Sequence, residues 1–305
     1  MSLLIKYRPK TLGEFVGASA RKVAIKLLKR RLAQLKEIRV GGSQVIIGQP
    51  LLIAVIGDFG CGKTSLTRLF GKGHFCSMSE ESGPCGPCAV CLGFEEQFDY
   101  GKGCLETSRL GSRTPTTKQN DIYSFRVLDL ANTDIDQLRE LISVIGPSNK
   151  FILPTFCRQF PEVVILDEAH RADKQTKQQA LLDALCHGLF SSVILSVARA
   201  NLHMMDEAFM QRFTPIYLEK PEFGELVAFA EGVAEKESVR FANKSVVEEL
   251  VEGANSVPRN VLRLLDMATL EDSAITSAWV EKMRLQIQPP PSALKVETDT
   301  RRMFP

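Results

Sequence analysis

The sequence predicts an α/β protein, in which a sheet of parallel strands is covered by helices and followed by a second, smaller, all-helical domain. Three observations predict this organisation. Short apolar segments alternate with helix-like segments as far as about residue 220, a pattern typical of parallel sheets. A glycine-rich turn joins one strongly apolar segment to the helix that follows it. After Pro221 only helical periodicity remains, and a chain of 305 residues has room for about two domains.

The expected elements follow from this periodicity. The segment 5–16 is expected to be extended, because Pro9 interrupts it, and a basic helix with one apolar stripe is expected over 18–36. Strands are expected at 44–47, 51–56, 126–130, 163–166 and 193–198, and helices at 63–70, 134–145 and 174–186. In the second domain, helices are expected at 223–235, 245–252, 258–269 and 275–286.

The charge of the chain is nearly balanced but unevenly distributed. The 38 basic and 36 acidic residues leave a net charge of only +2, which excludes a polycation. The first forty residues, however, carry eleven lysines and arginines against two glutamates. This asymmetry suggests a polyanionic partner near the amino end, although a solvated helix face explains it equally well.

Membrane and secreted proteins are disfavoured. No apolar segment approaches the ~20 residues needed to cross a bilayer. The opening MSLLIKYRPK also lacks the apolar stretch of a secretory signal. A cytoplasmic protein without membrane contacts is therefore expected.

The strongest motif is the segment GDFGCGKT at 57–64, which fits the phosphate-loop pattern G-x-x-x-x-G-K-[ST]. Glycines allow backbone N–H groups to turn inward around a phosphate, and the helix that starts here adds its dipole. Lys63 is expected to reach the β- and γ-phosphates, and Thr64 to supply an oxygen to Mg²⁺. The candidate nucleotide-binding residues of this loop are Gly57, Gly60, Cys61, Gly62, Lys63, Thr64 and Ser65.

A second motif, VVILDE at 163–168, is a buried strand with two carboxylates at its end. Asp167 is expected to bind Mg²⁺, and Glu168 to orient or deprotonate the attacking water. The letters DEAH at 167–170 also match a helicase box, but helicases need two nucleotide-fold domains and only one fits before Pro221. No guanine-reading N-K-x-D motif is present, so ATP is the expected nucleotide.

The third motif is a cysteine cluster with the pattern C-x8-C-x2-C-x2-C. Its thiolates are spaced so that they can converge on one ion, and four sulfur ligands leave no open position, so a structural Zn²⁺ is expected. An iron–sulfur cluster is the alternative. The expected zinc ligands are Cys76, Cys85, Cys88 and Cys91.

Taken in this order, the three motifs resemble the AAA+ clamp-loader ATPases, in particular the γ/τ type of bacterial DNA polymerase III, in which a four-cysteine zinc module follows the phosphate-loop helix. The resemblance covers about residues 6–269. It implies an AAA+ nucleotide-binding domain at 1–220 with the zinc module at about 71–104, a helical lid domain at 221–287 and a flexible tail at 288–305.

The resemblance also implies roles for single residues. The segment KYRPKTLGEFVG at 6–17 is similar to the box that packs around the adenine, whose matching residues are Tyr7, Arg8, Pro9, Val16 and Gly17. Arg212 matches the arginine finger that reaches a neighbouring subunit's ATP, and Arg259 matches the arginine of the lid. A gapless alignment places Ala198 at sensor 1, the polar residue that the family has at the end of this strand, and alanine cannot hydrogen-bond a phosphate or water. Sensor 1 is therefore assigned to Asn201, the nearest suitable side chain, whose spacing to Asp206 and Arg212 fits the AAA+ pattern within one residue.

The function implied by the resemblance is an ATP-dependent, DNA-associated ATPase of clamp-loader type that acts in DNA replication or repair. Its expected partners are duplex DNA, identical or different AAA+ neighbours, and a sliding clamp or another DNA-processing protein. One alternative is an AAA+ regulator of a mobile element or defence system, since about twenty residues after residue 286 leave no room for a collar domain. Another is a non-hydrolysing structural subunit. The expected DNA contacts are Arg171, Lys174 and Lys177.

Overall fold

The structure is a computed structural model that describes residues 2–34, 36–40, 43–47, 51–76, 83–88, 91–92, 94, 108–111, 122–145, 163–186 and 192–287. The chain divides into two compact units. The sheet unit comprises Pro9–Glu219, and the helical unit comprises Met1–Arg8 together with Lys220–Pro305. The first eight residues, expected within the nucleotide-binding domain, are thus grouped with the helices. The tail expected at 288–305 and part of the insert expected at 71–104 lie outside the described residues.

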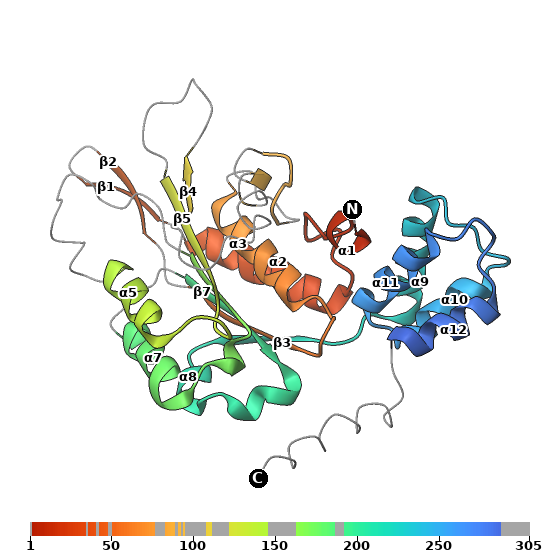
Figure 1. The fold of residues 1–305 in the computed structure, drawn as a ribbon. Coiled ribbons are helices and arrows are strands. Elements are labelled where there is room, and N and C mark those ends of the chain that lie inside the picture. The colour runs from red at the N-terminus through yellow and green to blue at the C-terminus, as the bar shows by residue number, and fades with distance from the viewer. Residues whose placement is uncertain are drawn as a thin grey trace, which may run out of the picture. The chain divides into compact units, whose positions relative to one another are not determined.

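The sheet unit contains a six-stranded sheet with the order β4-β5-β6-β7-β3-β8. Figure 1 labels four of its strands, β3, β4, β5 and β7. The strands β5, β6, β7, β3 and β8 are parallel to one another, and β4 pairs antiparallel with β5 at one edge. The predicted α/β class with a parallel sheet is therefore confirmed. The strands span Leu51–Gly57 (β3), Ser108–Gly111 (β4), Ile122–Asp129 (β5), Val163–Asp167 (β6), Ser192–Ala198 (β7) and Thr214–Leu218 (β8).

The register of the parallel strands aligns their carboxyl ends at one edge of the sheet. Gly57 at the end of β3 is paired with Ala198 at the end of β7, and Asp129 at the end of β5 is paired with Asp167 at the end of β6. Open α/β sheets bind their ligands at this edge. The glycine-rich motif at 57–64 and the acidic motif at 163–168 therefore lie at the same edge of the sheet.

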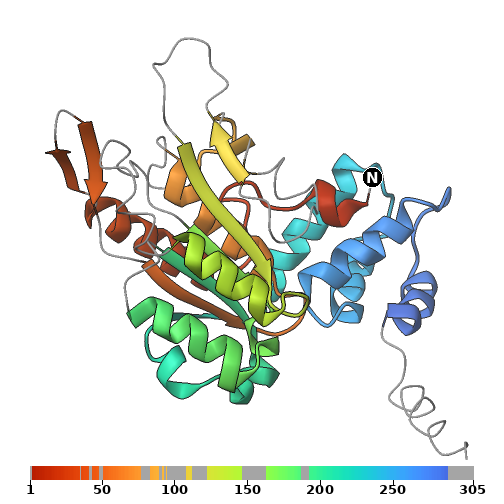
Figure 2. The same ribbon diagram turned by 60° about the vertical axis from the view of Figure 1, so that its left-hand side comes forward.

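Two hydrophobic clusters cover the two faces of the sheet, because successive side chains of a strand point to opposite faces. Ile53 and Val55 of β3 pack with the side chains of α2 (Ala18–Gln34) and α3 (Lys63–Phe75). Ala54 and Ile56 face the other cluster, with α5 (Ile135–Ile145), α7 (Gln179–Cys186) and α8 (Glu207–Met210). The two helical layers are visible in Figures 1 and 2.

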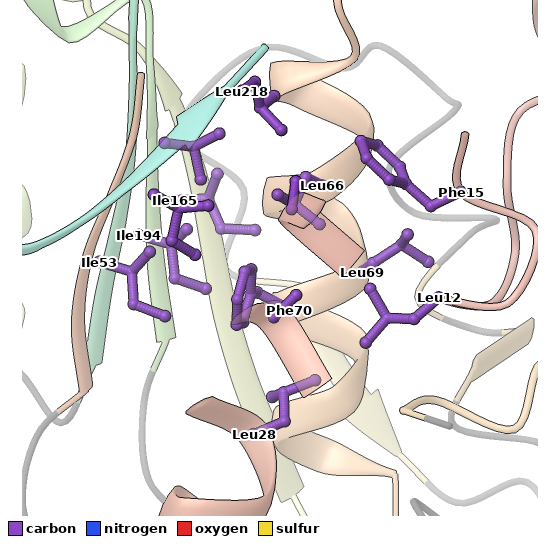
Figure 3. Packing of buried hydrophobic residues seen from close by; sticks show 14 of the residues in the cluster. Leu12, Phe15, Leu28, Ile53, Leu66, Leu69, Phe70, Ile165, Ile194 and Leu218 are labelled. Carbon is purple, nitrogen blue, oxygen red and sulfur yellow. The ribbon is translucent and has the colours of Figure 1, made fainter. Parts of the chain in front are cut away.

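Helix α3 lies between the sheet and the segment before α2 (Figure 3). Its Leu66, Leu69 and Phe70 are fully buried. They pack against isoleucines of the strands on one side and against Leu12 and Phe15 on the other. The helix that follows the phosphate loop is thus fixed from both sides.

Three strands were not expected from the sequence. Helix α2 ends at Gln34, and β1 (Lys36–Val40) pairs antiparallel with β2 (Ser43–Ile47) in a separate two-stranded sheet. The edge strands β4 and β8 of the main sheet were also missed. At the amino end, the expected extended segment begins instead with the one-turn helix α1 (Leu3–Lys6).

The helical unit contains the four helices expected from the sequence: α9 (Phe223–Lys236), α10 (Ser245–Gly253), α11 (Pro258–Ala268) and α12 (Ser277–Ile287). Leu226, Leu250, Leu264 and Val280, one from each helix, are buried. Pro258 occupies the first turn of α11, where its missing N–H costs no hydrogen bond. Within the described ranges of both units, no helix combines the length and the apolar character needed to cross a membrane.

The amino-terminal segment is attached to the helical unit by polar contacts. The hydroxyl of Ser2 and the backbone N–H of Leu3 both donate to the carboxylate of Asp266 in α11, at 3.0 and 3.1 Å. The Lys6 ammonium and the Tyr7 hydroxyl both contact Glu237. Burial, reinforced by the bond to Glu237, raises the pKa of Tyr7 to about 12. The phenol therefore remains a hydrogen-bond donor at neutral pH.

Candidate functional site

The phosphate loop connects β3 to α3. Gly62 precedes the helix with a φ of +94°, a conformation that L-residues with a side chain rarely adopt. A Cβ at this position would also lie 3.1 Å from the ring of Phe15. The first N–H groups of α3 lack intrahelical partners, and such helix starts attract anions. The loop is therefore shaped as the sequence predicts for a phosphate site.

Lys63 brings a positive charge into this loop. The residue is only 7% exposed. Its Nζ donates a hydrogen bond to the carbonyl of Asp58 at 3.1 Å and lies 5.2 Å from the ring centre of Phe59. A buried ammonium beside inward-facing N–H groups favours a polyanionic ligand.

Thr64 and Asp167, which are 103 positions apart in the sequence, meet at the carboxyl edge of the sheet. The Thr64 hydroxyl donates to Oδ2 of Asp167 at 3.1 Å. A hydroxyl and a carboxylate oxygen are the hard donors that Mg²⁺ prefers. The two residues predicted to bind Mg²⁺ are thus brought together and fit that ion chemically.

Glu168 follows Asp167 in a left-handed backbone conformation, with a φ of +50°. Its Oε2 is buried and accepts no hydrogen bond from the described part of the chain. This oxygen lies 3.2 Å from Nε2 of His170 and 4.0 Å from Nε of Arg171. A buried carboxylate oxygen that accepts no well-aligned hydrogen bond is uncommon in proteins outside functional sites.

His170 faces Glu168 from inside the fold. Its ring is buried, and its Nδ1 accepts a hydrogen bond from the backbone N–H of Ala198 at 3.4 Å. Burial lowers the pKa of His170 and outweighs the opposing effect of Glu168. With Nδ1 acting as acceptor, the proton of the neutral ring resides on Nε2, beside the Glu168 carboxylate. From the sequence, this histidine was considered only as the last letter of a helicase box.

Ser196 is a further polar residue of the site that sequence reasoning missed. It lies fully buried in β7, next to β6 in the sheet. Its hydroxyl donates to Oδ1 of Asp167 and accepts the backbone N–H of Glu168 at 3.1 Å. In the sequence, Ser196 is visible only as a serine within an otherwise apolar segment, and such a serine by itself indicates no function.

The four predicted zinc ligands converge. The sulfur atoms of Cys76, Cys85, Cys88 and Cys91 all lie within 4.8 Å of one another. The Cys76 and Cys88 sulfurs are 3.9 Å apart, close to the about 3.8 Å expected for two thiolates bound tetrahedrally at 2.3 Å to one zinc ion. The backbone N–H groups of Cys85 and Cys91 point to sulfurs of the cluster at 3.5 and 3.4 Å.

Two thiols of the cluster, those of Cys85 and Cys91, have raised pKa values. Burial raises the pKa of Cys85, and the pKa of Cys91 is raised by its hydrogen bond to Cys76 and by burial. A bound cation reverses this shift, because metal coordination stabilises thiolates. The donor set and its spacing therefore fit a tetrahedral, closed metal site.

The cysteine cluster packs against the phosphate-loop helix and the segment before α2. Gly83, between the first two cysteines, has a φ of +90°, and a Cβ there would lie 2.6 Å from Cδ1 of Leu12. A Cβ at Gly71 of α3 would lie 2.8 Å from Phe94, which is fully buried. Leu12 and Phe94, the neighbours at these two glycines, belong to the same hydrophobic cluster as Cys61 of the phosphate loop.

Comparison with known sequences finds similarity to two curated proteins of Arabidopsis thaliana. Protein STICHEL-like 3 is 21% identical over 283 residues, which cover 92% of this chain and 21% of that protein. Protein STICHEL-like 4 is 31% identical over 91 residues, which cover 30% of this chain and 8% of that protein. The chain thus spans about a fifth of the length of the relative that it matches most fully. No family model matches the chain.

Comparison with solved structures finds the RuvB Holliday junction branch migration motor of Thermotoga maritima, with a TM-score of 0.53 and 16% identity. The match covers 92% of this chain and 72% of the RuvB chain. The chain has a RuvB-like AAA+ fold. Together with the STICHEL-like similarity over 92% of the chain, this fold supports the resemblance to AAA+ ATPases that the motifs indicated.

The other residues expected to act in an AAA+ site are divided between the two units. Pro9, Val16 and Gly17 belong to the sheet unit, whereas Tyr7, Arg8 and Arg259 belong to the helical unit. The ring of Phe15, the neighbour of Val16, lies against the phosphate loop at Gly62. Asn201 is half-buried in the short helix Arg199–Met204, and Arg212 is exposed in the turn between α8 and β8. The roles of these residues stay predictions.

The three expected DNA contacts lie on the segment after β6. Arg171 ends the turn Ala169–Arg171 and is exposed. Lys174 and Lys177 lie in the π-helical turn Lys174–Gln178. Their ammonium groups donate to backbone carbonyls, Lys174 to His203 at 3.0 Å and Lys177 to Leu130 at 3.5 Å. Arg171 and Lys174 are exposed, whereas Lys177 is half-buried.

Proposed function

We propose that this AAA+ protein binds and hydrolyses ATP with Mg²⁺ at the carboxyl edge of its sheet. The observation that carries the proposal is the contact at 3.1 Å between Thr64 of the phosphate-loop helix and Asp167 of β6. At this contact the phosphate-loop motif and the acidic motif at the end of β6, which are distant in the sequence, form one oxygen-lined site beside the buried Lys63. A bound Mg²⁺, held by Thr64 and Asp167, would neutralise charge on the phosphates.

Each residue of the site has a distinct task in this proposal. Lys63 and the N–H groups at the start of α3 bind the β- and γ-phosphates. Glu168 orients the attacking water and accepts its proton as a general base. Arg212, exposed on the sheet unit, stabilises the transferred phosphoryl group in a neighbouring subunit's site. Hydrolysis by the isolated chain should therefore be slow and should increase with protein concentration.

The cysteine cluster is proposed to hold one structural Zn²⁺. Its four sulfur ligands leave no coordination position for substrate. Its packing against Leu12 and α3 gives the ion a role in stabilising the sheet unit. An iron–sulfur cluster would instead be coloured, so an absorption spectrum together with metal analysis decides between the two.

We further propose that the protein acts on duplex DNA, in replication or repair, as an assembly with AAA+ neighbours and in contact with a sliding clamp or another DNA-processing protein. Arg171 is the leading candidate for a phosphate contact, because it is exposed and lies three residues from Glu168. Backbone contacts of this kind make affinity depend on salt. Titration of duplex DNA with and without ATP tests this, and affinity that ignores both ATP and salt would contradict it.

The decisive experiment for hydrolysis compares the wild type with Glu168→Gln in a Mg²⁺-ATPase assay. Loss of the general base should lower kcat by about 10²–10⁴-fold while ATP binding persists. Glu231→Gln, an exposed glutamate of the helical unit, is the matched control and should retain full turnover. A Glu168→Gln variant as fast as the wild type would remove Glu168 from the mechanism. ATP binding without turnover in the wild type would indicate a non-hydrolysing subunit.

A further inference from the structure

Strand β7 contains two serines whose side chains are fully buried, and they do different things. Ser192, at the amino end of the strand, accepts a hydrogen bond from the backbone N–H of Leu51 at 3.1 Å. Ser196 lies nearer the carboxyl end, and its partners are Asp167 and Glu168. A buried hydroxyl is unfavourable unless it is hydrogen-bonded. Ser192 joins two strands, whereas Ser196 contacts the two acidic residues of the nucleotide site.

We propose that Ser196 is a positioning residue for Asp167 and Glu168, an inference that rests on the proposed ATPase function. Its hydroxyl uses its hydrogen to bind Oδ1 of Asp167 and a lone pair to accept the N–H of Glu168. Oδ1 is thereby fixed, and Oδ2 faces the hydroxyl of Thr64 at 3.1 Å. The orientation of the carboxylate proposed to bind Mg²⁺ is set from the neighbouring strand.

The same hydroxyl fixes the backbone of Glu168. A non-glycine residue with a φ of +50° needs stabilisation from its surroundings. The N–H of Glu168 is shared between Ser196 Oγ and Asp167 Oδ1, each at 3.1 Å. This bond to β7 defines where the Glu168 side chain leaves the backbone.

A second hydrogen bond joins the same strand to His170, whose ring faces the side chain of Glu168. Ala198, two residues after Ser196, donates its N–H to Nδ1 of His170, whose Nε2 lies 3.2 Å from Oε2 of Glu168. Strand β7 thus holds the backbone of Glu168 through Ser196 and faces its carboxylate through His170. Ser196 itself acts through Asp167 and Glu168 and is not placed in contact with nucleotide.

The test compares Ser196→Ala with Ser192→Ala, which removes an equally buried hydroxyl from the same strand. Calorimetry measures ADP binding first in EDTA and then as Mg²⁺ is increased, and a parallel assay measures ATP turnover. Outer-shell partners of a metal ligand typically change metal affinity or activity by about 10–100-fold. We expect Ser196→Ala to need about tenfold more Mg²⁺ and to lower kcat about tenfold, with ADP affinity in EDTA unchanged.

Ser192→Ala should lose thermal stability without changing the Mg²⁺ requirement. Ser196→Thr, which keeps the hydroxyl, should recover most of the Mg²⁺ affinity, and it provides the readout if Ser196→Ala does not fold. The inference would be overturned if Ser196→Ala and Ser192→Ala needed the same Mg²⁺ concentration. It would also be overturned if Ser196→Thr folded but needed as much Mg²⁺ as Ser196→Ala. If the wild type does not hydrolyse ATP, the proposed function fails, but the Mg²⁺ titration of the ADP complex still decides the role of Ser196.

Discussion

The nucleotide site and the cysteine cluster lie in the same unit but obtain their geometry in different ways. The residues of the nucleotide site stand at the ends of buried strands, where the register of the sheet places Gly57 beside Ala198 and Asp129 beside Asp167. The cysteines lie outside the main sheet, at the end of α3 and in the turns that follow. The difference implies that the sheet preforms one site, whereas a bound ion completes the other.

The segment before α2 connects the two regions. Leu12 is fully buried and contacts the cluster at Gly83, and Phe15 contacts the phosphate loop at Gly62. The ammonium of Lys72, buried in α3, donates to the carbonyl of Lys10 at 2.7 Å and fixes the start of this segment. Loss of the ion from the cluster should therefore lower ATP affinity at the nucleotide loop, but only moderately.

Among the variants that compare the nucleotide site with the cysteine cluster, Lys63→Ala should produce the largest loss of turnover. Removing a preorganised cation that faces developing charge typically lowers kcat by about 10²–10³-fold, and ATP affinity should fall as well. The zinc content should stay at about one ion per chain, because Lys63 begins α3 whereas Cys76, the first cysteine of the cluster, follows the other end of that helix. Measured ATPase rates and metal analysis of the same preparation check both statements. Loss of zinc in this variant would mean that the two regions are not independent.

His170→Ala should lower kcat about tenfold, as expected for a residue that orients a reacting group through its carboxylate. The KM for ATP should change little, because His170 contacts Glu168 rather than the phosphate loop. His203→Ala, an exposed histidine of the same unit, is the control and should behave as the wild type. A rise in KM at constant kcat would instead assign His170 to nucleotide binding.

The strands that are buried on both faces of the sheet were predictable, because such strands have to consist mainly of apolar residues. The strands β3, β6 and β7 are continuous apolar segments and were found. The edge strand β8 was missed, because three of its five residues are exposed and Pro215 interrupts the strand signal. Strand β2 was expected, but its partner β1 was missed because the charged start of β1 continues the helical pattern of α2. Its signal was the glycine pair at 41–42 between two segments of strand-forming residues.

The site shows the same division between local and spatial information. Lys63, Thr64, Asp167 and Glu168 were predictable, because each belongs to a motif whose chemistry requires that residue type. Ser196 and His170 were not assigned to the site, because their roles depend on β6 and β7 being neighbours. That adjacency is a property of the sheet order, and no local pattern in the sequence expresses it.

Cys88→Ser tests how strongly the cluster influences the nucleotide loop. The variant should lose its zinc, and its ATP affinity should fall by about fivefold, equivalent to about 1 kcal/mol of coupling through shared packing. Cys186→Ser, which changes an exposed cysteine outside the cluster, should leave both quantities unchanged. Calorimetric ATP titrations and metal analysis provide the measurements. Unchanged ATP affinity in a zinc-free variant would show that the segment before α2 transmits nothing.

The smallest expected effect is a difference in ATP affinity between Gly83→Ala and Gly86→Ala. It separates the effect of displacing Leu12 from the effect of backbone strain within the cluster. Gly83 and Gly86 have nearly equal φ values of +90° and +91°, so alanine at either position carries a similar backbone strain of about 1–2 kcal/mol. The new methyl group at Gly83 would lie 2.6 Å from Leu12, whereas at Gly86 it would lie 3.3 Å from Thr11. Gly83→Ala must displace a buried side chain, and Gly86→Ala needs only a small shift. We therefore expect ATP affinity to fall about twofold more in Gly83→Ala, while both variants lose similar zinc affinity. Equal ATP affinities would place the link between the two regions elsewhere than at Leu12.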